Sequence, residues 1–426
     1  MSDERSRGPG PWAWIPSLYL AEGLPYVLVM TVSVILYKRL GISNTDIALY
    51  TSWLYLPWVV KPLWSPVVDI LGTRRRWIWG MQVAIGAALA GVALAIPAPA
   101  MFRWTLIFFW LAAFESATHD IAADGFYMLG TSERDQSLFV GVRSLFYRVA
   151  TIAGQGLLVV LAGTLETRTG NVHLAWTIAL GAVAAVMLAF GFWHRLVLPR
   201  PASDRPGDAR EIGRFVRAFL ATFGSFFARP RIAAVLGFLL LFRLGEAQLV
   251  KMVSPFLLDA RAKGGLALTT AQVGWVYGTV GIAALTVGGL LGGWMVARRG
   301  LKASLWPMML AIHLPDAVFI YLAYTQPTNL AIVQACVALE QFGYGFGFTA
   351  FLVYMMYVSR GQHQTAHYAI CTGFMALGMM IPGMWSGWLA DAIGYRHFFS
   401  CVILATIPSF LVALAIPLDA EFGKQA

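Results

Sequence analysis

Long apolar runs dominate the chain, and only isolated polar residues interrupt each of them. Every run is about 20 residues or longer, which is enough to cross the hydrocarbon core of a bilayer as a helix. The pattern therefore predicts an all-α membrane protein with twelve spans. They are 13–37, 47–71, 77–98, 104–129, 137–163, 173–197, 232–258, 270–297, 303–324, 329–357, 365–390 and 397–417.

A long polar segment, 198–230, divides the spans six and six and is rich in proline and arginine. Its second half, 211–227, places apolar residues at helical spacing and predicts an amphipathic helix on the membrane surface. We expect residues 1–197 and 231–426 to form two six-helix bundles related by pseudo-two-fold symmetry, with 198–230 as a cytoplasmic linker.

Composition agrees with a membrane protein, since 58% of the residues are hydrophobic and 12% are charged. A net charge of +10 would suggest a nucleic-acid partner in a soluble chain. Here most lysines and arginines fall in loops that alternate spans place on one side, so topology explains the charge and we expect no nucleic acid. The positive-inside rule then puts both termini in the cytoplasm. The three cysteines, Cys336, Cys371 and Cys401, are far apart and have no disulfide or metal spacing.

Two basic turns repeat between the halves. One follows span two and joins Asp69 and Gly72 to three arginines, and the other follows span eight and runs from Gly292 to Lys302. Such turns can pair with acidic helix ends, and internal repeats are typical of secondary transporters, with the site near the midplane. We therefore assign a structural gating role to Asp69, Arg74, Arg75, Arg76, Asp124, Arg298 and Arg299.

Six predicted spans each place one charged residue at a similar depth. At about 1.5 Å per residue, these residues lie roughly 14–20 Å from a span end, which is the middle third of a core about 30 Å thick. A charge at mid-membrane costs roughly 2.5–3.5 kcal/mol even on lenient scales, so six at one depth predict a functional polar site. The residues are Glu22, Lys61, Glu115, Arg148, Arg243 and Glu340.

The fourth span carries four ionisable residues between positions 115 and 124. Glu115 and His119 lie within about 40° on a helix, so they could load and release a proton together. The alternative is a pair that only packs one helix against another. Asp120 and Asp124 form a second pair, and we expect Asp124 to clamp the first basic turn.

Two further constellations allow two interpretations each. Arg243 and Glu246 are three residues apart and can neutralise each other, although the depth of Arg243 favours a functional role. Tyr344 lies among alternating glycines and aromatic residues in span ten. Close helix packing explains the glycines, and the tyrosine ring can still face a sugar or peptide.

Other chemistry has no signal in the sequence. Phosphate-binding glycine loops, metal-ligand spacings and the serine elbow are not found. No polar portion is large enough for an ATPase domain, so energy for transport would come from a gradient. We expect no enzyme activity, no cofactor other than a proton gradient, and no metal.

The chain resembles the major facilitator superfamily, and within it the AmpG-type muropeptide permeases and the related peptide, acetyl-CoA and drug transporters. The resemblance covers most of the 426 residues. The matching segments are Glu22-Gly-Leu-Pro25, Lys61-Pro-Leu-Trp-Ser-Pro-Val-Val-Asp69, Asp120-Ile-Ala-Ala-Asp124, Tyr147-Arg148, Leu244-Gly-Glu-Ala247, Glu340 to Ala350, and Gly387-Trp-Leu-Ala390. The chain departs from the pattern at Glu22, Glu115 and His119, and twelve spans are expected here where longer members carry two more.

The resemblance implies proton-driven import of N-acetylglucosaminyl-anhydromuramyl peptides through a bacterial inner membrane by alternating access. An importer of siderophores of the same family is the alternative, and a non-transporting membrane receptor is a further one. We expect a monomer that contacts membrane lipid and a glycopeptide or siderophore-like solute. Predicted substrate-binding residues are Lys61, Asp120, Arg148, Arg243, Glu340 and Tyr344. Predicted proton-coupling residues are Glu22, Glu115, His119 and Glu246.

Overall fold

A computed structural model describes residues 9–206, 212–361, 363–419 and 422–424. All regular elements in these ranges are helical, as predicted. Their limits match each predicted span to within a few residues, which confirms the interpretation of the apolar pattern.

Eight helical stretches in the described ranges are long and apolar enough to cross a membrane. Thr270–Thr325 and Ala366–Ala413 contain 56 and 48 residues, and at about 1.5 Å per residue each is more than twice as long as the hydrocarbon core is thick. Each turns back at one glycine, Gly300 with φ 79° and Gly394 with φ 74°. Such backbone angles are strained for any residue with a Cβ.

The chain divides into two compact units, whose boundary between Val216 and Arg217 falls in the expected linker, and only Ser33–Val59 departs from the expected division. The first unit is Met1–Val32 with Val60–Val216, and the second is Ser33–Val59 with Arg217–Ala426. The segment Ser33–Val59, here called the first hairpin, is N-terminal in sequence but packs within the second unit.

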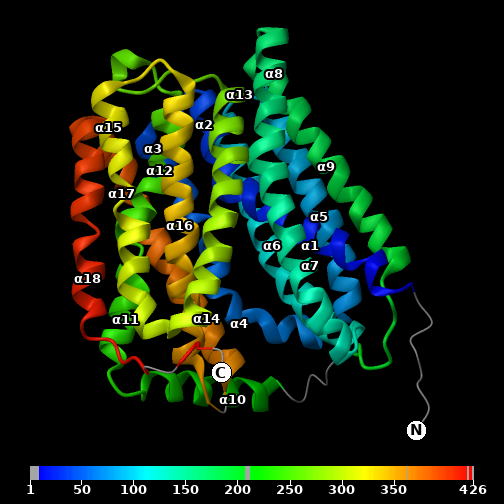
Figure 1. Ribbon diagram of the computed structural model, residues 1–426. Helices are drawn as coiled ribbons and strands as arrows, with labels where there is room; N and C mark the ends of the chain where they lie inside the picture. Colours follow the sequence, from blue (N-terminus) through cyan, green and yellow to red (C-terminus); the bar gives the residue numbers. More distant parts are fainter. Residues whose placement is uncertain (1–8, 207–211, 362, 420–421, 425–426) are drawn as a thin grey trace. The chain divides into compact units, whose positions relative to one another are not determined.

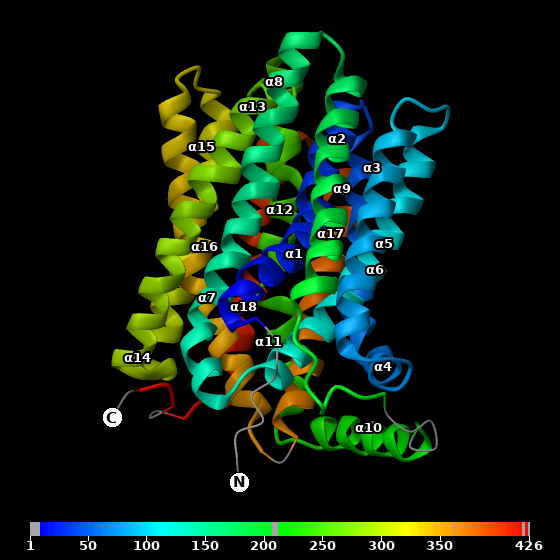
Figure 2. The ribbon, with the colours of Figure 1, turned by 90° about the vertical axis from the view of Figure 1, so that its right-hand side faces the viewer.

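Helices of the first unit are α1 (Ile15–Val27), α4 (Leu56–Ile70, which begins in the first hairpin), α5 (Arg74–Ala95), α6 (Met101–Gly130), α7 (Glu133–Thr151), α8 (Val159–Thr169) and α9 (Val172–Val197). Two π-helical segments, Leu28–Val32 and Ile152–Leu158, continue α1 and α7. The helix α5 packs between α6 and α9, and α1 packs against α7 (Figure 2).

Helices of the second unit are α2 (Ser33–Arg39), α3 (Asn44–Trp53), α10 (Ile212–Phe227), α11 (Ile232–Leu241), α12 (Leu244–Leu258), α13 (Thr270–Val273), α14 (Ile282–His313), α15 (Ala317–Thr325), α16 (Leu330–Ser359), α17 (Gln364–Leu404) and α18 (Ile407–Ala413). The predicted amphipathic segment is indeed a helix, α10, which runs crosswise to α11 (Figures 1 and 2). Many of its side chains lie outside the described ones.

Local sequence explains where many spans begin. At five helix starts a short polar side chain accepts the backbone N–H three residues later, which satisfies a donor that the helix itself leaves unpaired. The five capping residues are Ser43, Thr73, Ser132, Asn171 and Thr269. Each of these residues follows a short loop, so each cap fixes the residue at which the next helix begins.

Glycines in span ten are packing residues, as one of the two interpretations expected. A Cβ on Gly343, Gly345 or Gly347 would lie 2.0–2.3 Å from a backbone carbonyl oxygen of α14. The helix α16 is therefore in backbone contact with both arms of α14, on either side of Gly300 (Figure 1).

Large apolar side chains remain exposed along the outside of the helices, including Phe192, Leu290, Leu314 and Trp388. A soluble monomer rarely exposes apolar surface on this scale. The exposed residues follow the long helices, which is the arrangement expected of a lipid-facing surface.

Candidate functional site

Five charged side chains of four different helices meet in the first unit. They are Glu22 of α1, Lys61 of α4, Asp120 and Asp124 of α6, and Arg143 of α7, and we call them the charge cluster. One oxygen from each of its three carboxylates lies within 4.8 Å of the others. Of the predicted site residues, the structure therefore brings Glu22, Lys61, Asp120 and Asp124 together.

Asp120 is the centre of the charge cluster. Its carboxylate forms an ion pair with the Lys61 ammonium, and one of its oxygens lies within 4.8 Å of a carboxylate oxygen of Glu22 and of Asp124. Asp120 is on α6, so this contact depends on the packing of α4 near α6. The Oε2 atom of Glu22 is buried and has no hydrogen-bond partner among the described residues.

Asp124 has a different partner from the one expected. It pairs with Arg143 rather than with the basic turn, and the Tyr19 hydroxyl donates to its Oδ1 at 3.4 Å. The Arg143 guanidinium lies over the rings of Tyr19 and Tyr127, at 4.3 and 4.4 Å from their centroids. Arg143 could not be assigned from sequence, because its partner is on another helix.

The basic turn instead packs beside Asp124. Arg74 donates to the carbonyl of Gly125 at 3.3 Å, and a Cβ at Gly125 would meet the Arg74 side chain at 2.5 Å. The absence of a side chain at Gly125 is therefore what lets Arg74 reach α6. This contact supports a packing role for the turn without requiring an ion pair to Asp124.

A linker carboxylate binds the N-terminus of α5, whose first turn contains the three arginines of the basic turn. Asp204 accepts the backbone N–H groups of Arg74 and Arg75 at 2.8 and 3.1 Å, a position where the helix dipole favours an anion. The Arg75 guanidinium donates to the Leu198 carbonyl at 3.0 Å. The linker is thus attached to the first unit through the turn.

The remaining residues predicted to act in gating are arginines on the surface and one aspartate. Arg76, Arg298 and Arg299 are exposed, and Arg298 lies over the Trp294 ring at 4.7 Å. The side chain of Asp69 lies outside the described ones.

Glu115 and His119 do not form the predicted pair, although they are close on the helix surface. The His119 imidazole is buried and hydrogen bonds to the Gln82 amide on α5 at 2.9 Å. Glu115 is half-buried, and its Oε2 has no hydrogen-bond partner in the described part of the chain. Although both side chains lie on one side of α6, the His119 imidazole bonds to Gln82 of the neighbouring helix α5 instead of to Glu115.

Gln82 continues this contact into a buried chain that the sequence analysis missed. Its Oε1 accepts from His194 Nδ1 of α9 at 2.8 Å, and His194 Nε2 lies 2.9 Å from the Ser17 hydroxyl of α1. The four side chains join α1, α5, α6 and α9, and position His119 next to Asp120. The available signal was the lone glutamine in the otherwise apolar third span.

The second unit contains a closed pair instead of a cluster. The Arg243 guanidinium donates to both Glu246 oxygens, at 2.9 and 2.7 Å, and to the Tyr344 hydroxyl at 2.7 Å. Its charge also lies 4.6 Å from the Phe348 ring centroid. Mutual neutralisation, one of the two interpretations of this spacing, therefore describes the contact that is formed.

Three other buried or half-buried charges have no ionic partner among the described residues. The amide of Gln341 donates to both Glu340 oxygens, at 3.3 and 3.0 Å. Both carboxyl oxygens of Asp316 are buried without a hydrogen-bond partner. Arg148 of α7 is half-buried and makes no described ion pair.

A protein-family model for the Major Facilitator Superfamily matches residues 17–381. The chain belongs to the major facilitator superfamily. This family consists of transporters, so the chain is a membrane transporter, and the expected fold class is confirmed.

Relatives of this transporter include the Anhydromuropeptide permease of Escherichia coli (strain K12), which is 26% identical over 416 residues that cover 96% of the chain and 80% of that permease. An uncharacterized protein of Haemophilus influenzae is 28% identical and is matched over 86% of its length by 87% of the chain. Putative transporter AmpG 4 of Rickettsia conorii is 24% identical, with 93% of the chain and 94% of that protein covered.

Solved structures show the same fold at low sequence identity. The nucleoside transporter NupG superposes with a TM-score of 0.68 at 13% identity, over 95% of the chain and 98% of NupG. A bacterial homolog of the human lysosomal transporter Spinster, in an inward-facing and occupied conformation, gives 0.68 at 15% identity, over 96% and 98%.

Proposed function

We propose that this transporter carries anhydromuropeptides, or a related amphiphilic solute with carboxylates, into a bacterial cell. Uptake would be driven by protons and would proceed by alternating access in the inner membrane, with both termini cytoplasmic. The names of the relatives support the substrate class, and loop charge supports the orientation. The charge cluster carries the proposal of coupling.

Charge balance in the cluster favours the uptake of one positive charge. Fully ionised, its three carboxylates are compensated by two cations, Lys61 and Arg143, so one negative charge is left over. Carboxylates this close resist simultaneous ionisation, and a bound proton or a monovalent cation removes the excess. The site thus suits a coupling ion that binds and leaves during transport.

Glu22 is the strongest candidate for the proton carrier. Its side chain is only 8% exposed, has an oxygen within 4.8 Å of the Asp120 and Asp124 carboxylates, and keeps one oxygen without a hydrogen-bond partner among the described residues. A proton on Glu22 would give it a donor for a neighbouring carboxylate and would remove the excess negative charge. Glu246 and His119 are less suited, since Arg243 holds the first and the Gln82 amide the second. Glu115, whose Oε2 also has no partner among the described residues, stays a second candidate.

Lys61 and Arg148 are the proposed contacts for substrate carboxylates. The Lys61 ammonium is paired with Asp120, and its side chain is about one-quarter exposed. A solute carboxylate can therefore compete with Asp120 for the ammonium. Arg148 is half-buried without a described acidic partner. Tyr344 and Glu340 stay proposed substrate contacts, while the bidentate pair of Arg243 favours a structural role for that residue.

Uptake into proteoliposomes tests the proposal directly. Labelled anhydromuropeptide should accumulate under an imposed pH gradient, and Glu22→Gln should abolish accumulation while leaving exchange of solute across the membrane. Asp316→Asn, which changes an equally buried carboxyl outside the charge cluster, is the matched control and should stay coupled.

Other outcomes of the same assay contradict specific parts of the proposal. Accumulation driven only by a sodium gradient would replace the proton with Na⁺ at the charge cluster. Uptake of a ferric siderophore but not of muropeptide would support the alternative substrate. Absence of any flux with purified, folded protein would favour a receptor.

A further inference from the structure

The first hairpin is pressed against α12 and α17 so closely that the contact depends on glycines. A Cβ at Gly387 would lie 1.9 Å from the Asn44 carbonyl oxygen, and one at Gly383 would lie 2.6 Å from the Ser52 hydroxyl. Both glycines are on α17, and they let α3 pack against its backbone. We call this contact the hairpin seam.

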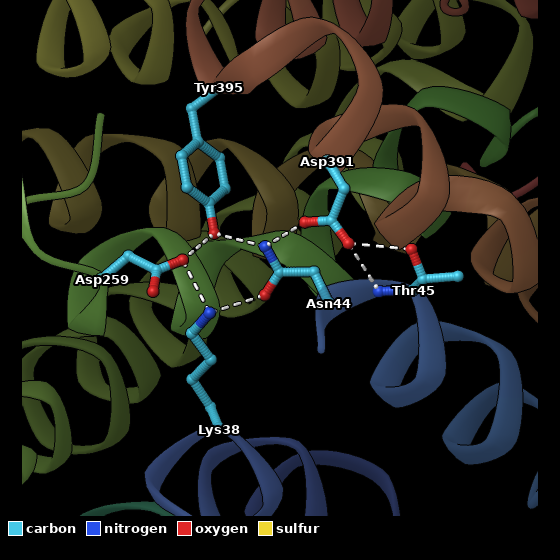
Figure 3. A network of polar contacts seen from close by, with 6 residues as sticks. All are labelled: Lys38, Asn44, Thr45, Asp259, Asp391 and Tyr395. Atoms are coloured by element: carbon cyan, nitrogen blue, oxygen red, sulfur yellow. Dashed lines mark hydrogen bonds and ion pairs between the residues drawn. The ribbon is translucent and has the colours of Figure 1, made fainter. Parts of the chain in front are cut away.

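A polar network closes one end of the hairpin seam (Figure 3). It joins Lys38, Asn44 and Thr45 of the first hairpin to Asp259, Asp391 and Tyr395. We call these six residues the latch.

The latch contacts are short and mostly charge-assisted. Lys38 donates to Asp259 at 2.6 Å and to Asn44 at 2.8 Å, while the Asn44 amide donates to Asp391 at 2.9 Å. Tyr395 also donates to Asp259 at 2.6 Å. Lys38 lies in the last turn of α2, Asn44 begins α3 and Asp259 follows α12. Loop charge predicts that these helix ends face outside.

Behind the latch lies a lysine whose charge the seam does not compensate. Lys251 of α12 is 2% exposed and lies about 10 Å along the helix from its end at Leu258. Its ammonium donates to the Thr51 hydroxyl at 2.9 Å and lies 5.2 Å from the Tyr55 ring centroid. No acidic group pairs with it among the described residues.

A second polar group of the seam is also unpartnered. The Ser52 hydroxyl is fully buried and has no hydrogen-bond partner in the described part of the chain. It lies beside Gly383, and so does the Lys251 side chain, whose Cε is 3.5 Å from the Cβ position of that glycine. The seam therefore encloses an ammonium and a hydroxyl with unused donors.

Packing alone does not account for a lysine at this position. A methionine has a similar length and would fill the same space without burying a charge, which is costly when no opposite charge is near. An ammonium carries three donors, and the seam uses one of them. The missing partner has the chemistry of an anion.

We infer that Lys251 and Ser52 form a carboxylate-binding site for the transported solute, exposed when the first hairpin separates from α12 and α17. The latch holds this site shut in the conformation described. This inference rests on the proposed function, because it assigns a further contact to the same solute. The Lys251 ammonium would bind the carboxylate as an ion pair, and the Ser52 hydroxyl would donate to it.

Uptake kinetics test the ligand chemistry. With a muropeptide whose carboxylates are free, Lys251→Met should raise KM by about tenfold, the loss expected for one charge-assisted hydrogen bond. Lys251→Arg should restore most of this loss. With the carboxylates amidated, wild type and Lys251→Met should have the same KM. Equal KM values of wild type and Lys251→Met for the free acid would overturn the inference.

Cysteine accessibility tests the opening without any substrate. In a background whose three native cysteines are replaced by serine, Lys251→Cys should react slowly with a charged thiol reagent added outside. Lys38→Ala and Asp391→Ala together should speed this reaction by about tenfold or more, since each breaks charge-assisted contacts. Ala350→Cys, in the core of the same unit, is the buried control and should stay unreactive.

The uptake and accessibility measurements together separate failure of this inference from failure of the proposed function. If Lys251→Cys stays as unreactive as Ala350→Cys after the latch is broken, the site does not open and the inference is wrong. If wild type takes up no muropeptide but the accessibility changes as expected, the substrate proposal fails and the opening of the seam stands. Size-exclusion profiles of each variant identify misfolded protein, and Ser52→Cys repeats the accessibility measurement at the second residue.

Discussion

The two units use buried charge in different ways. In the first unit, three carboxylates share two cations, and one oxygen of Glu22 is unpartnered. In the second, Arg243 and Glu246 satisfy each other through two hydrogen bonds, and Tyr344 adds a third. The charges of the first arrangement do not cancel, whereas those of the Arg243–Glu246 pair do.

This difference indicates which charges can take part in a transport cycle. A neutral bidentate pair offers no site for an additional ion unless it is first broken. An unbalanced cluster changes its charge when it binds a proton or a solute, so its geometry can follow the cycle. We therefore expect substitutions in the Arg243–Glu246 pair to affect folding and those in the charge cluster to affect transport.

The largest effect on stability should come from Glu246→Ala. The Arg243 and Glu246 side chains are 9% and 1% exposed, and breaking a buried pair by removing one partner costs about 3–5 kcal/mol. The thermal unfolding midpoint of the purified protein measures the loss. The double variant Arg243→Met with Glu246→Leu should recover most of it, and failure to recover would show that the charges themselves are needed.

Lys61→Met should reduce uptake by roughly tenfold or more, because Asp120 loses its cation and the solute loses a charge-assisted contact. Lys61→Arg should keep most of the activity. In contrast to the second unit, the double variant Lys61→Met with Asp120→Leu should not recover uptake. Recovery would mean that this pair is structural too, and the contrast between the units would fail.

Gln82→Leu should reduce stability less than Glu246→Ala does. The substitution leaves His119 and His194 without their shared amide, at an expected cost of about 1–3 kcal/mol in unfolding free energy. Gln248→Leu is the matched control, since that buried amide donates to its own helix at 3.2 Å. If the unfolding midpoints of both variants change equally, Gln82 does not stabilise the protein by bridging the two histidines.

Sequence patterns predicted the spans well and the partners of charged residues poorly. The apolar runs give helix positions directly, because a bilayer requires about 20 apolar residues per crossing. Depth along a helix also identified Glu22 and Lys61, which both belong to the charge cluster. Rotation about the helix was less informative, as Glu115 and His119 show.

The partners of Asp124 and His119 depend on neighbouring helices. Arg143 reaches Asp124 between two tyrosine rings, and Gln82 reaches His119 from α5. Neither contact has a local spacing that a single helix could reveal. Both arise from long-range packing, which hydrophobic periodicity does not specify.

The sequence by itself determined the helical membrane fold and the limits of the spans, and it predicts the depth of the charges. These follow from hydrophobicity and from the rise of a helix, which are local properties. Only the tertiary structure decided that the first hairpin packs in the second unit, where it covers Lys251. That result depends on Gly383 and Gly387 meeting a helix more than 300 positions earlier in the chain, and a distant contact of this kind has no signature in a single sequence.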